Sequence, residues 1–332
     1  PLAQEPDESS LNLTNPSLSV GRNWPMEDLR KALYNVNGSA KAALKEGEKA
    51  DIVAIMNESF SDLAILGDFK TNVEILPFTS RLDTDIRLGT SHSSVVGGGT
   101  ANSEFEFLTG ASMGFMEDGS IPYEEYISED LPSLARVLGE QGYETMAMHP
   151  YWDDAWSRKT IYPKLGFDRM KFQEDFIHQD KVRNFISDKA LYDEILMELG
   201  RGTGKDNQFI FAVSIQNHGD YVQNPEDNFD PGVLLYEVRG QKIRDEKTGE
   251  FLESFLEDRE DGLLAGFSPA NKIRFIESTE EYLGLIRESD RALAYFVNQL
   301  KYRERPTLLV FFGDHQPAER AAQVFTHGGD CP

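Results

Sequence analysis

The sequence predicts an α/β fold in which a doubly wound, mostly parallel central sheet carries helices on both faces. Four short apolar segments have the length and composition of buried strands, and segments with helical spacing lie between them. The expected strands cover residues 52–56, 145–148, 209–215 and 308–312. Because each is almost continuously apolar, both faces of the sheet are expected to be covered.

Two segments carry apolar side chains at helical spacing. The first covers about 131–138 and is closed by Gly142. The second is expected from about Ser278 to Lys301, where Ser278 and Glu281 fit a capping box. Strands that alternate with helices favour parallel pairing in one sheet.

The ends of the expected domain differ from its middle. Residues 1–24 are rich in Pro, Ser, Asn and acidic residues, so they are expected to form an irregular arm or linker. Residues 25–332 are expected to form a single domain. Within it, the polar and turn-rich segment 222–275 is interpreted as an insertion, with a hairpin around 247–249.

Composition excludes several classes of protein. The chain has 33 Lys and Arg against 57 Asp and Glu, a formal charge of −24, which disfavours a nucleic-acid partner. Its one cysteine, Cys331, excludes an internal disulfide framework and a cysteine-based zinc cluster. No apolar run reaches the roughly 18 residues of a membrane span.

Residues typical of functional sites follow each expected strand. Glu58, His149, His218 and the pair Asp314 and His315 stand at or just past the four carboxyl ends. A polar residue after one strand is commonly a turn former. Because the carboxyl ends of parallel strands meet at one edge of the sheet, the set together indicates a shared site.

Two carboxylates and an imidazole form a candidate metal site. Glu58, Asp314 and His315 offer oxygen and nitrogen ligands suited to Mn²⁺, Zn²⁺ or Mg²⁺. The alternative is an acidic turn beside a histidine that caps its strand. Two buried carboxylates at one edge would repel each other unless a cation or protons neutralised them.

Thr100 is the candidate nucleophile. It follows glycines 97–99 and precedes a segment expected to be helical, where free N–H groups favour a phosphate. A threonine hydroxyl is a weak nucleophile, and direct coordination to a metal ion would activate it. The alternative is a flexible glycine loop with Thr100 as an ordinary N-cap.

Residues 149–158 combine groups that suit a phosphate ester. Arg158 can bind a phosphate oxygen, and Trp156 can line one side of a substrate pocket. His218, outside this segment, can donate a hydrogen bond to a phosphoryl oxygen or transfer a proton. Trp156 as a plain core residue is the alternative. Three further histidines, at positions 92, 178 and 327, lack such surroundings.

The ordered motifs resemble those of lipoteichoic acid synthases and related bacterial phosphoglycerol transferases, in the sulfatase and alkaline phosphatase superfamily. The resemblance covers roughly residues 50–317. It rests on these segments: Asn57-Glu58-Ser59-Phe60, Gly99-Thr100-Ala101-Asn102-Ser103-Glu104, His149 with Trp156 and Arg158, Asn217-His218, and Gly313-Asp314-His315.

The resemblance implies one Mn²⁺ site, with Mg²⁺ or Zn²⁺ as alternatives, and Thr100 as nucleophile. It implies transfer of glycerol phosphate from phosphatidylglycerol, through a threonine ester, to a polymer, glycolipid or glycan acceptor. The implied metal ligands are Glu58, Thr100, Asp314 and His315. The implied contacts of the phosphoglycerol group are His149, Trp156, Arg158 and His218.

The resemblance also implies a cellular setting. The full-length protein is expected to be anchored by N-terminal transmembrane helices absent from this sequence, with this domain at the extracellular face of a bacterial plasma membrane. The sequence ends soon after His315, whereas domains of the family continue with further strands and a helix. A truncated C-terminus is therefore expected.

Other functions stay open beside this one. Enzymes of the same superfamily include phosphodiesterases, which use water as acceptor, and phosphoethanolamine transferases. A catalytically silent wall-binding ectodomain is an alternative of another class. A formylglycine sulfatase is disfavoured because Thr100 stands where a cysteine or serine is needed.

Overall fold

The computed structural model describes residues 49–82, 86–201, 207–222, 229–257 and 262–318. The expected arm at 1–24 lies outside these residues. Within the described part of the chain, no helix is long and apolar enough to cross a bilayer.

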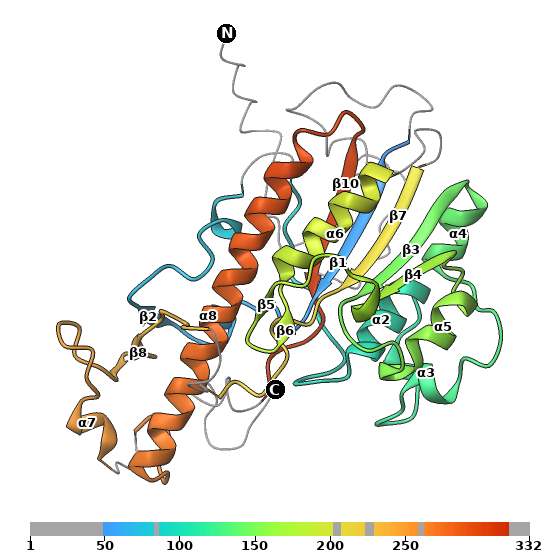
Figure 1. The fold of residues 1–332 in the computed structure, drawn as a ribbon. Helices are drawn as coiled ribbons and strands as arrows, with labels where there is room; N and C mark the ends of the chain where they lie inside the picture. Colours follow the sequence, from blue (N-terminus) through green and yellow to red (C-terminus); the bar gives the residue numbers. More distant parts are fainter. Residues whose placement is uncertain (1–48, 83–85, 202–206, 223–228, 258–261, 319–332) are drawn as a thin grey trace, which may run out of the picture.

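Five parallel strands form the central sheet, in the order β10-β1-β7-β3-β4. This confirms the predicted fold class (Figure 1). The strands are β1 Asp51–Asn57, β3 Tyr143–His149, β4 Arg169–Phe172, β7 Asn207–Val213 and β10 Thr307–Gly313. All four predicted strands are present; β4 was not predicted, and β7 ends before the predicted limit at Ile215, which is buried in the following turn.

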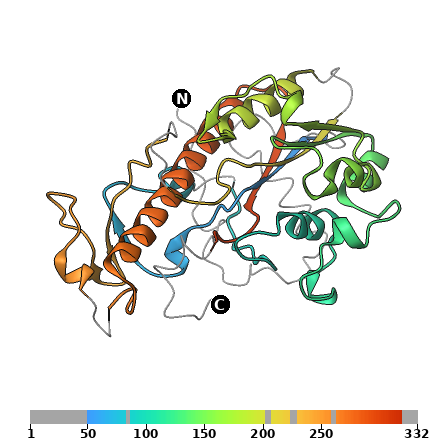
Figure 2. The same cartoon turned by 60° about the horizontal axis from the view of Figure 1, so that its bottom comes forward.

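Helices cover both faces of this sheet, which explains the continuous apolar character of its strands. On β1, Val53 and Ile55 pack with α6 and α8, whereas Ala54 and Met56 pack on the opposite face with α2, α4 and α5. The two layers are visible in Figures 1 and 2. The helices are α2 Thr100–Thr109, α3 Pro122–Glu125, α4 Leu134–Glu140, α5 Arg158–Lys164, α6 Asp188–Arg201, α7 Glu253–Leu256 and α8 Pro269–Leu300.

Helix α8 begins earlier than the sequence predicted. The Ser268 side chain accepts a hydrogen bond from the Asn271 backbone N–H, and Pro269 occupies the first turn, where its missing N–H needs no partner. Ser278 and Glu281 are both buried inside the helix, so the predicted capping box was wrong. The end near Lys301 was predicted correctly.

The segment interpreted as an insertion joins a second, smaller sheet. Strands β2 Phe69–Thr71, β8 Leu235–Val238 and β9 Gln241–Lys242 pair antiparallel. The predicted hairpin near 247–249 is confirmed by an antiparallel bridge between Arg244 and Phe251. This sheet has its own apolar core with the first half of α8.

A separate two-stranded ribbon comprises β5 Lys181–Val182 and β6 Phe185–Ile186. The division into one domain with an insertion stays a prediction.

Candidate metal and catalytic site

The register between β1 and β10 brings the two candidate carboxylates together. Asn57 is paired with Gly313, so Glu58 and Asp314 leave the sheet side by side. The Asp314 backbone N–H donates to the Asn57 carbonyl at 3.3 Å. Gly313 is required here, because a Cβ at this position would lie 1.9 Å from the Phe60 carbonyl oxygen.

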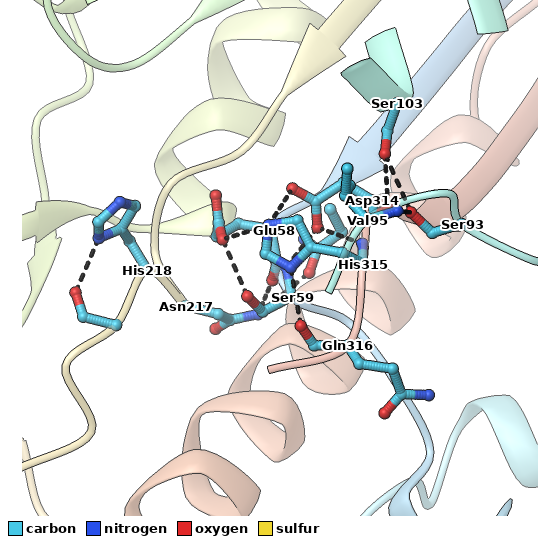
Figure 3. A network of polar contacts seen from close by, with 12 residues as sticks. Glu58, Ser59, Ser93, Val95, Ser103, Asn217, His218, Asp314, His315 and Gln316 are labelled. Atoms are coloured by element: carbon cyan, nitrogen blue, oxygen red, sulfur yellow. Dashed lines mark hydrogen bonds and ion pairs between the residues drawn. The ribbon is translucent and has the colours of Figure 1, made fainter. Parts of the chain in front are cut away.

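Glu58, Asp314 and His315 form a buried cluster. One ligand atom from each lies within 4.8 Å of the others. His315 Nε2 is 3.2 Å from Asp314 Oδ2 and 3.7 Å from Glu58 Oε1 (Figure 3). The three side chains are almost entirely removed from solvent. Two carboxylates and an imidazole are thus concentrated where water cannot screen them.

The donor set fits a metal ion. His315 Nδ1–H donates to the Gln316 carbonyl at 2.8 Å, which leaves the Nε2 lone pair facing the carboxylates. Among the described residues, neither His315 Nε2 nor Asp314 Oδ2 has a hydrogen-bond partner. Buried polar atoms are rarely left in this state, so a cation bound between them would satisfy both.

The pKa values of the two carboxyl groups also favour a bound cation. Burial, reinforced by the nearby Asp314 charge, holds the pKa of Glu58 well above its usual range. Burial also raises the pKa of Asp314. Both groups therefore resist being charged together, as the sequence indicated, and a divalent ion would offset their repulsion.

Short hydrogen bonds fix one oxygen of each carboxylate. The Ser59 N–H donates to Asp314 Oδ1 at 2.7 Å, and the Ser59 hydroxyl donates to Glu58 Oε1 at 2.9 Å. The His315 N–H also donates to Asp314 Oδ1, at 2.8 Å. Ser59 was not singled out by the sequence, although it directly follows Glu58.

Thr100 stands at the first position of α2 and faces this cluster. Gly99 is the N-cap, in the left-handed region with φ 83°, so Thr100 is not the cap that one alternative supposed. The Thr100 side chain lies beside Asp314, close enough to oppose in part the rise that burial causes in the pKa of that carboxyl. Ser103, one turn later, donates to the Asp314 carbonyl at 2.7 Å. The helix N-terminus is therefore held against the candidate metal ligands.

Arg158 is turned towards a protein carboxylate. Its Nε and Nη2 donate to Glu104 Oε1 at 2.9 and 2.6 Å, and both side chains are buried. Nη1 donates to the Ala155 carbonyl at 3.2 Å. Its charge nevertheless reaches the site, because it opposes in part the rise in the pKa of Glu58 and adds to the fall in the pKa of His149. Glu104 lies on α2, one turn beyond Thr100, so this ion pair also anchors the helix that carries the candidate nucleophile.

His149 is the last residue of β3, and Trp156 lies in the turn just before α5. His149 Nδ1–H donates to the Val213 carbonyl at 3.0 Å, and burial followed by the Arg158 charge holds the pKa of His149 well below its usual range. The imidazole is therefore neutral at neutral pH. Trp156 and Ser157 have φ angles of 56° and 55°, a conformation that non-glycine residues seldom adopt. Such backbone is often found where a side chain must be aimed at a ligand.

Asn217 and His218, which follow β7, lie in different environments. Asn217 is buried and its Nδ2 donates to the Glu58 carbonyl at 3.0 Å. His218 is exposed, its Nδ1–H donates to the Gly219 carbonyl at 2.7 Å, and it lies apart from the cluster in Figure 3. His178, set aside by the sequence, is paired with Glu194 away from this site.

A buried network behind Glu58 was missed by the sequence. Asp188, on α6, accepts hydrogen bonds from Asn57 Nδ2 at 2.8 Å and from the Ser289 hydroxyl at 2.6 Å. Ser289 lies on α8, so the network ties two helices to the end of β1. A helical spacing of Leu191, Ile195 and Leu199 was the available signal for α6.

The comparisons with known proteins agree with this geometry. The family model described as Sulfatase matches residues 50–330. A Rhizobium meliloti (strain 1021) protein named for cyclic β-1,2-glucan modification is 32% identical over 269 residues, which are 81% of this chain and 36% of the relative. The chain spans less than half the length of the curated relatives that it matches first.

Two solved structures share the fold. The phosphoglycerol transferase GacH of Streptococcus pyogenes, in complex with sn-glycerol-1-phosphate, aligns with a TM-score of 0.60 at 20% identity, over 90% of this chain and 70% of that one. The lipoteichoic acid synthase LtaP of Listeria monocytogenes aligns with a TM-score of 0.54 at 19% identity, over 85% and 62%. The resemblance expected from the motifs is thereby confirmed for the fold.

Proposed function

The chain belongs to the sulfatase family, and we propose that within it the chain acts as a metal-dependent phosphoglycerol transferase of the lipoteichoic acid synthase type. Its donor would be phosphatidylglycerol, and its acceptor a polymer, glycolipid or glycan. The observation that carries this proposal is the position of the Thr100 side chain beside Asp314, at the buried cluster of Glu58, Asp314 and His315.

Glu58, Thr100, Asp314 and His315 would hold one divalent ion, for which we propose Mn²⁺, with Mg²⁺ and Zn²⁺ suited to the same donors. When bound, such an ion lowers the pKa of a hydroxyl ligand and offsets charge on phosphoryl oxygens.

The proposed first step is displacement at phosphorus by the Thr100 hydroxyl oxygen. A bond forms between this oxygen and phosphorus, the bond from phosphorus to the diacylglycerol oxygen breaks, and that oxygen takes up the proton that Thr100 gives up. In the second step an acceptor hydroxyl displaces Thr100, which regains a proton.

The surroundings of Thr100 suit this chemistry. Free N–H groups at the start of α2 attract a phosphate, and the positive charge of Arg158 adds to this attraction. Arg158 is held by Glu104, so we propose that it acts mainly through its charge. We propose that Trp156, His218 and the neutral imidazole of His149 contact the glycerol head group.

The name of one relative supports a glycan acceptor. A protein named for glucan modification matches this chain over 81% of its length. From the resemblance to lipoteichoic acid synthases, we propose that the domain works at the extracellular face of a bacterial plasma membrane, anchored by helices in a longer protein.

The proposal is tested by following release of diacylglycerol from phosphatidylglycerol vesicles with Mn²⁺, with and without a soluble glucan. A transferase should pass most of the glycerol phosphate to the glucan and release little free glycerol phosphate. If free glycerol phosphate is the main product at every glucan concentration, the chain is a phosphodiesterase and the proposal is wrong.

A further inference from the structure

A separate cavity of about 210 Å³ lies between the segment after β7 and the first half of α8. Its lining residues are Tyr221, Val222, Asn271, Arg274, Phe275, Glu277 and Ser278. Pockets for drug-sized ligands are roughly 300–1,000 Å³, so this cavity has room for a smaller unit. Helix α8 runs from the small sheet to the central sheet (Figure 1).

One stripe of α8 faces this cavity. Asn271, Arg274, Phe275 and Ser278 stand at positions i, i+3, i+4 and i+7, which places them on one side of the helix. Ile276 on the same helix is fully buried in the apolar core. The side towards the cavity thus mixes an aromatic ring with hydrogen-bonding groups, instead of the apolar side chains of a packed interface.

Ser278 gives an independent sign of a ligand. The residue is only 6% exposed, and its hydroxyl oxygen has no hydrogen-bond partner among the described residues. A buried hydroxyl without a partner destabilises the protein. The hydroxyl oxygen itself is closed to solvent, and a side-chain rotation of Ser278 towards the cavity that it lines would let a ligand hydroxyl supply the missing partner.

Tyr221 connects the cavity to the candidate catalytic cluster. Tyr221 lines the cavity, and its side chain lies beside Ser59, the residue that holds Glu58 and Asp314. The ring also packs edge-on against Tyr282, with centroids 5.2 Å apart. The cavity therefore lies one side chain away from the proposed metal ligands.

We propose that this cavity is the acceptor subsite and binds one neutral monosaccharide unit of a glycan. The proposal rests on the proposed function, because it assigns the acceptor of the same reaction. It would place an acceptor close to the cluster while leaving the donor side at Arg158 and His149 free.

The chemistry of the lining favours a neutral sugar. The rings of Tyr221 and Phe275 offer flat apolar faces for the C–H groups of a sugar ring. Asn271, Arg274 and Glu277 together supply donors and acceptors for its hydroxyls. Arg274 and Glu277 contribute opposite charges, so the cavity has no excess of cations to attract a polyanionic glycerol phosphate chain, which the formal charge of −24 would also repel.

The test is direct binding by the whole chain, measured by saturation-transfer NMR and by calorimetry. The probes are a neutral cyclic β-1,2-glucan and a glycerol phosphate oligomer. The glucan should bind the wild type and the Thr100→Ala variant equally. The double variant Asn271→Ala/Arg274→Ala, at two exposed positions, should bind it at least tenfold more weakly, and Arg291→Ala, an exposed position elsewhere on α8, should bind as the wild type does.

Three results would overturn the inference: unchanged glucan affinity in the double variant, no glucan binding to the wild type, or binding of the oligomer in place of the glucan. Formation of an ester on Thr100 from phosphatidylglycerol needs no acceptor, so it separates the two proposals. An ester without glucan binding leaves the proposed function and removes this subsite. Glucan binding without an ester supports the sugar site and removes the proposed transfer.

Discussion

Glu104 is predicted to be a main support of the site, although it contacts no proposed ligand of the metal. It accepts two hydrogen bonds from Arg158, one from the Tyr162 hydroxyl at 2.8 Å and one from the Tyr123 hydroxyl at 3.3 Å. Burial alone would lower the pKa of Arg158, but the Glu104 charge outweighs it and raises this pKa. The Arg158 guanidinium therefore stays charged, and the Glu104 carboxylate compensates this buried charge.

The substitution Glu104→Gln keeps the shape of the side chain and removes this anion. Removing one partner of a buried ion pair lowers the free energy of unfolding by about 3–5 kcal/mol, because the other charge is left uncompensated. The new amide N–H₂ would also face the tyrosine hydroxyls in place of an acceptor. We expect a loss within this range, a large part of the stability of an ordinary domain.

Urea denaturation at pH 7, followed by tryptophan fluorescence, measures this loss. The matched control is Glu124→Gln, an exposed position on α3, which should change stability by less than about 0.5 kcal/mol. The double variant Glu104→Gln/Arg158→Met should lose less than the sum of the two single changes, since no unpaired charge remains. A loss below about 1 kcal/mol for Glu104→Gln would refute the reasoning.

Three further predictions concern stability, pH and metal. The Lys171 ammonium lies 2.5 Å from Glu194 and 2.8 Å from Glu198, and both carboxylates are buried. The variant Lys171→Met should therefore lower the free energy of unfolding, measured by urea titration, by about 3–5 kcal/mol. A loss under about 1 kcal/mol would contradict this. His149 has a depressed pKa when folded, so the unfolded chain gains a proton first as the pH falls below about 6.5, and stability should fall by up to about 1.4 kcal/mol per pH unit. The His149→Gln variant should show a shallower fall between pH 6.5 and 5, and equal slopes would count against a neutral buried imidazole. Mn²⁺ at about 100 times its dissociation constant should stabilise the protein by about 2.7 kcal/mol. The melting temperature should rise accordingly, EDTA should reverse the rise, and the Asp314→Asn variant should not show it. An equal rise in that variant would place the ion elsewhere.

The position of the candidate site could be predicted from sequence because its residues follow strands. Apolar runs locate β1 and β10, and the geometry of a parallel sheet then brings Glu58 and Asp314 to one edge. The sequence also indicated the repulsion between buried carboxylates. Pattern and topology were sufficient for these residues, since each is fixed by the strand that it follows.

Residues whose role depends on packing could not be predicted. Arg158 has the chemistry of a phosphate ligand, but its partner Glu104 is determined by how α5 packs against α2. Asp188 reaches Asn57 only because α6 covers the sheet. The early start of α8 was missed because Ser278 and Glu281 fit the sequence pattern of a capping box. The N-cap residue in the structure is Ser268, which precedes Pro269.

The central claim is that Thr100 carries the transferred group, and intact-protein mass spectrometry tests it most directly. After incubation with phosphatidylglycerol and Mn²⁺, without acceptor, the wild type should gain the mass of one glycerophosphoryl group, and peptide fragmentation should place it on Thr100. The control Thr109→Ala, at the far end of α2, should gain the same mass. No added mass in the metal-loaded wild type, or the same mass on Thr100→Ala, would contradict the account.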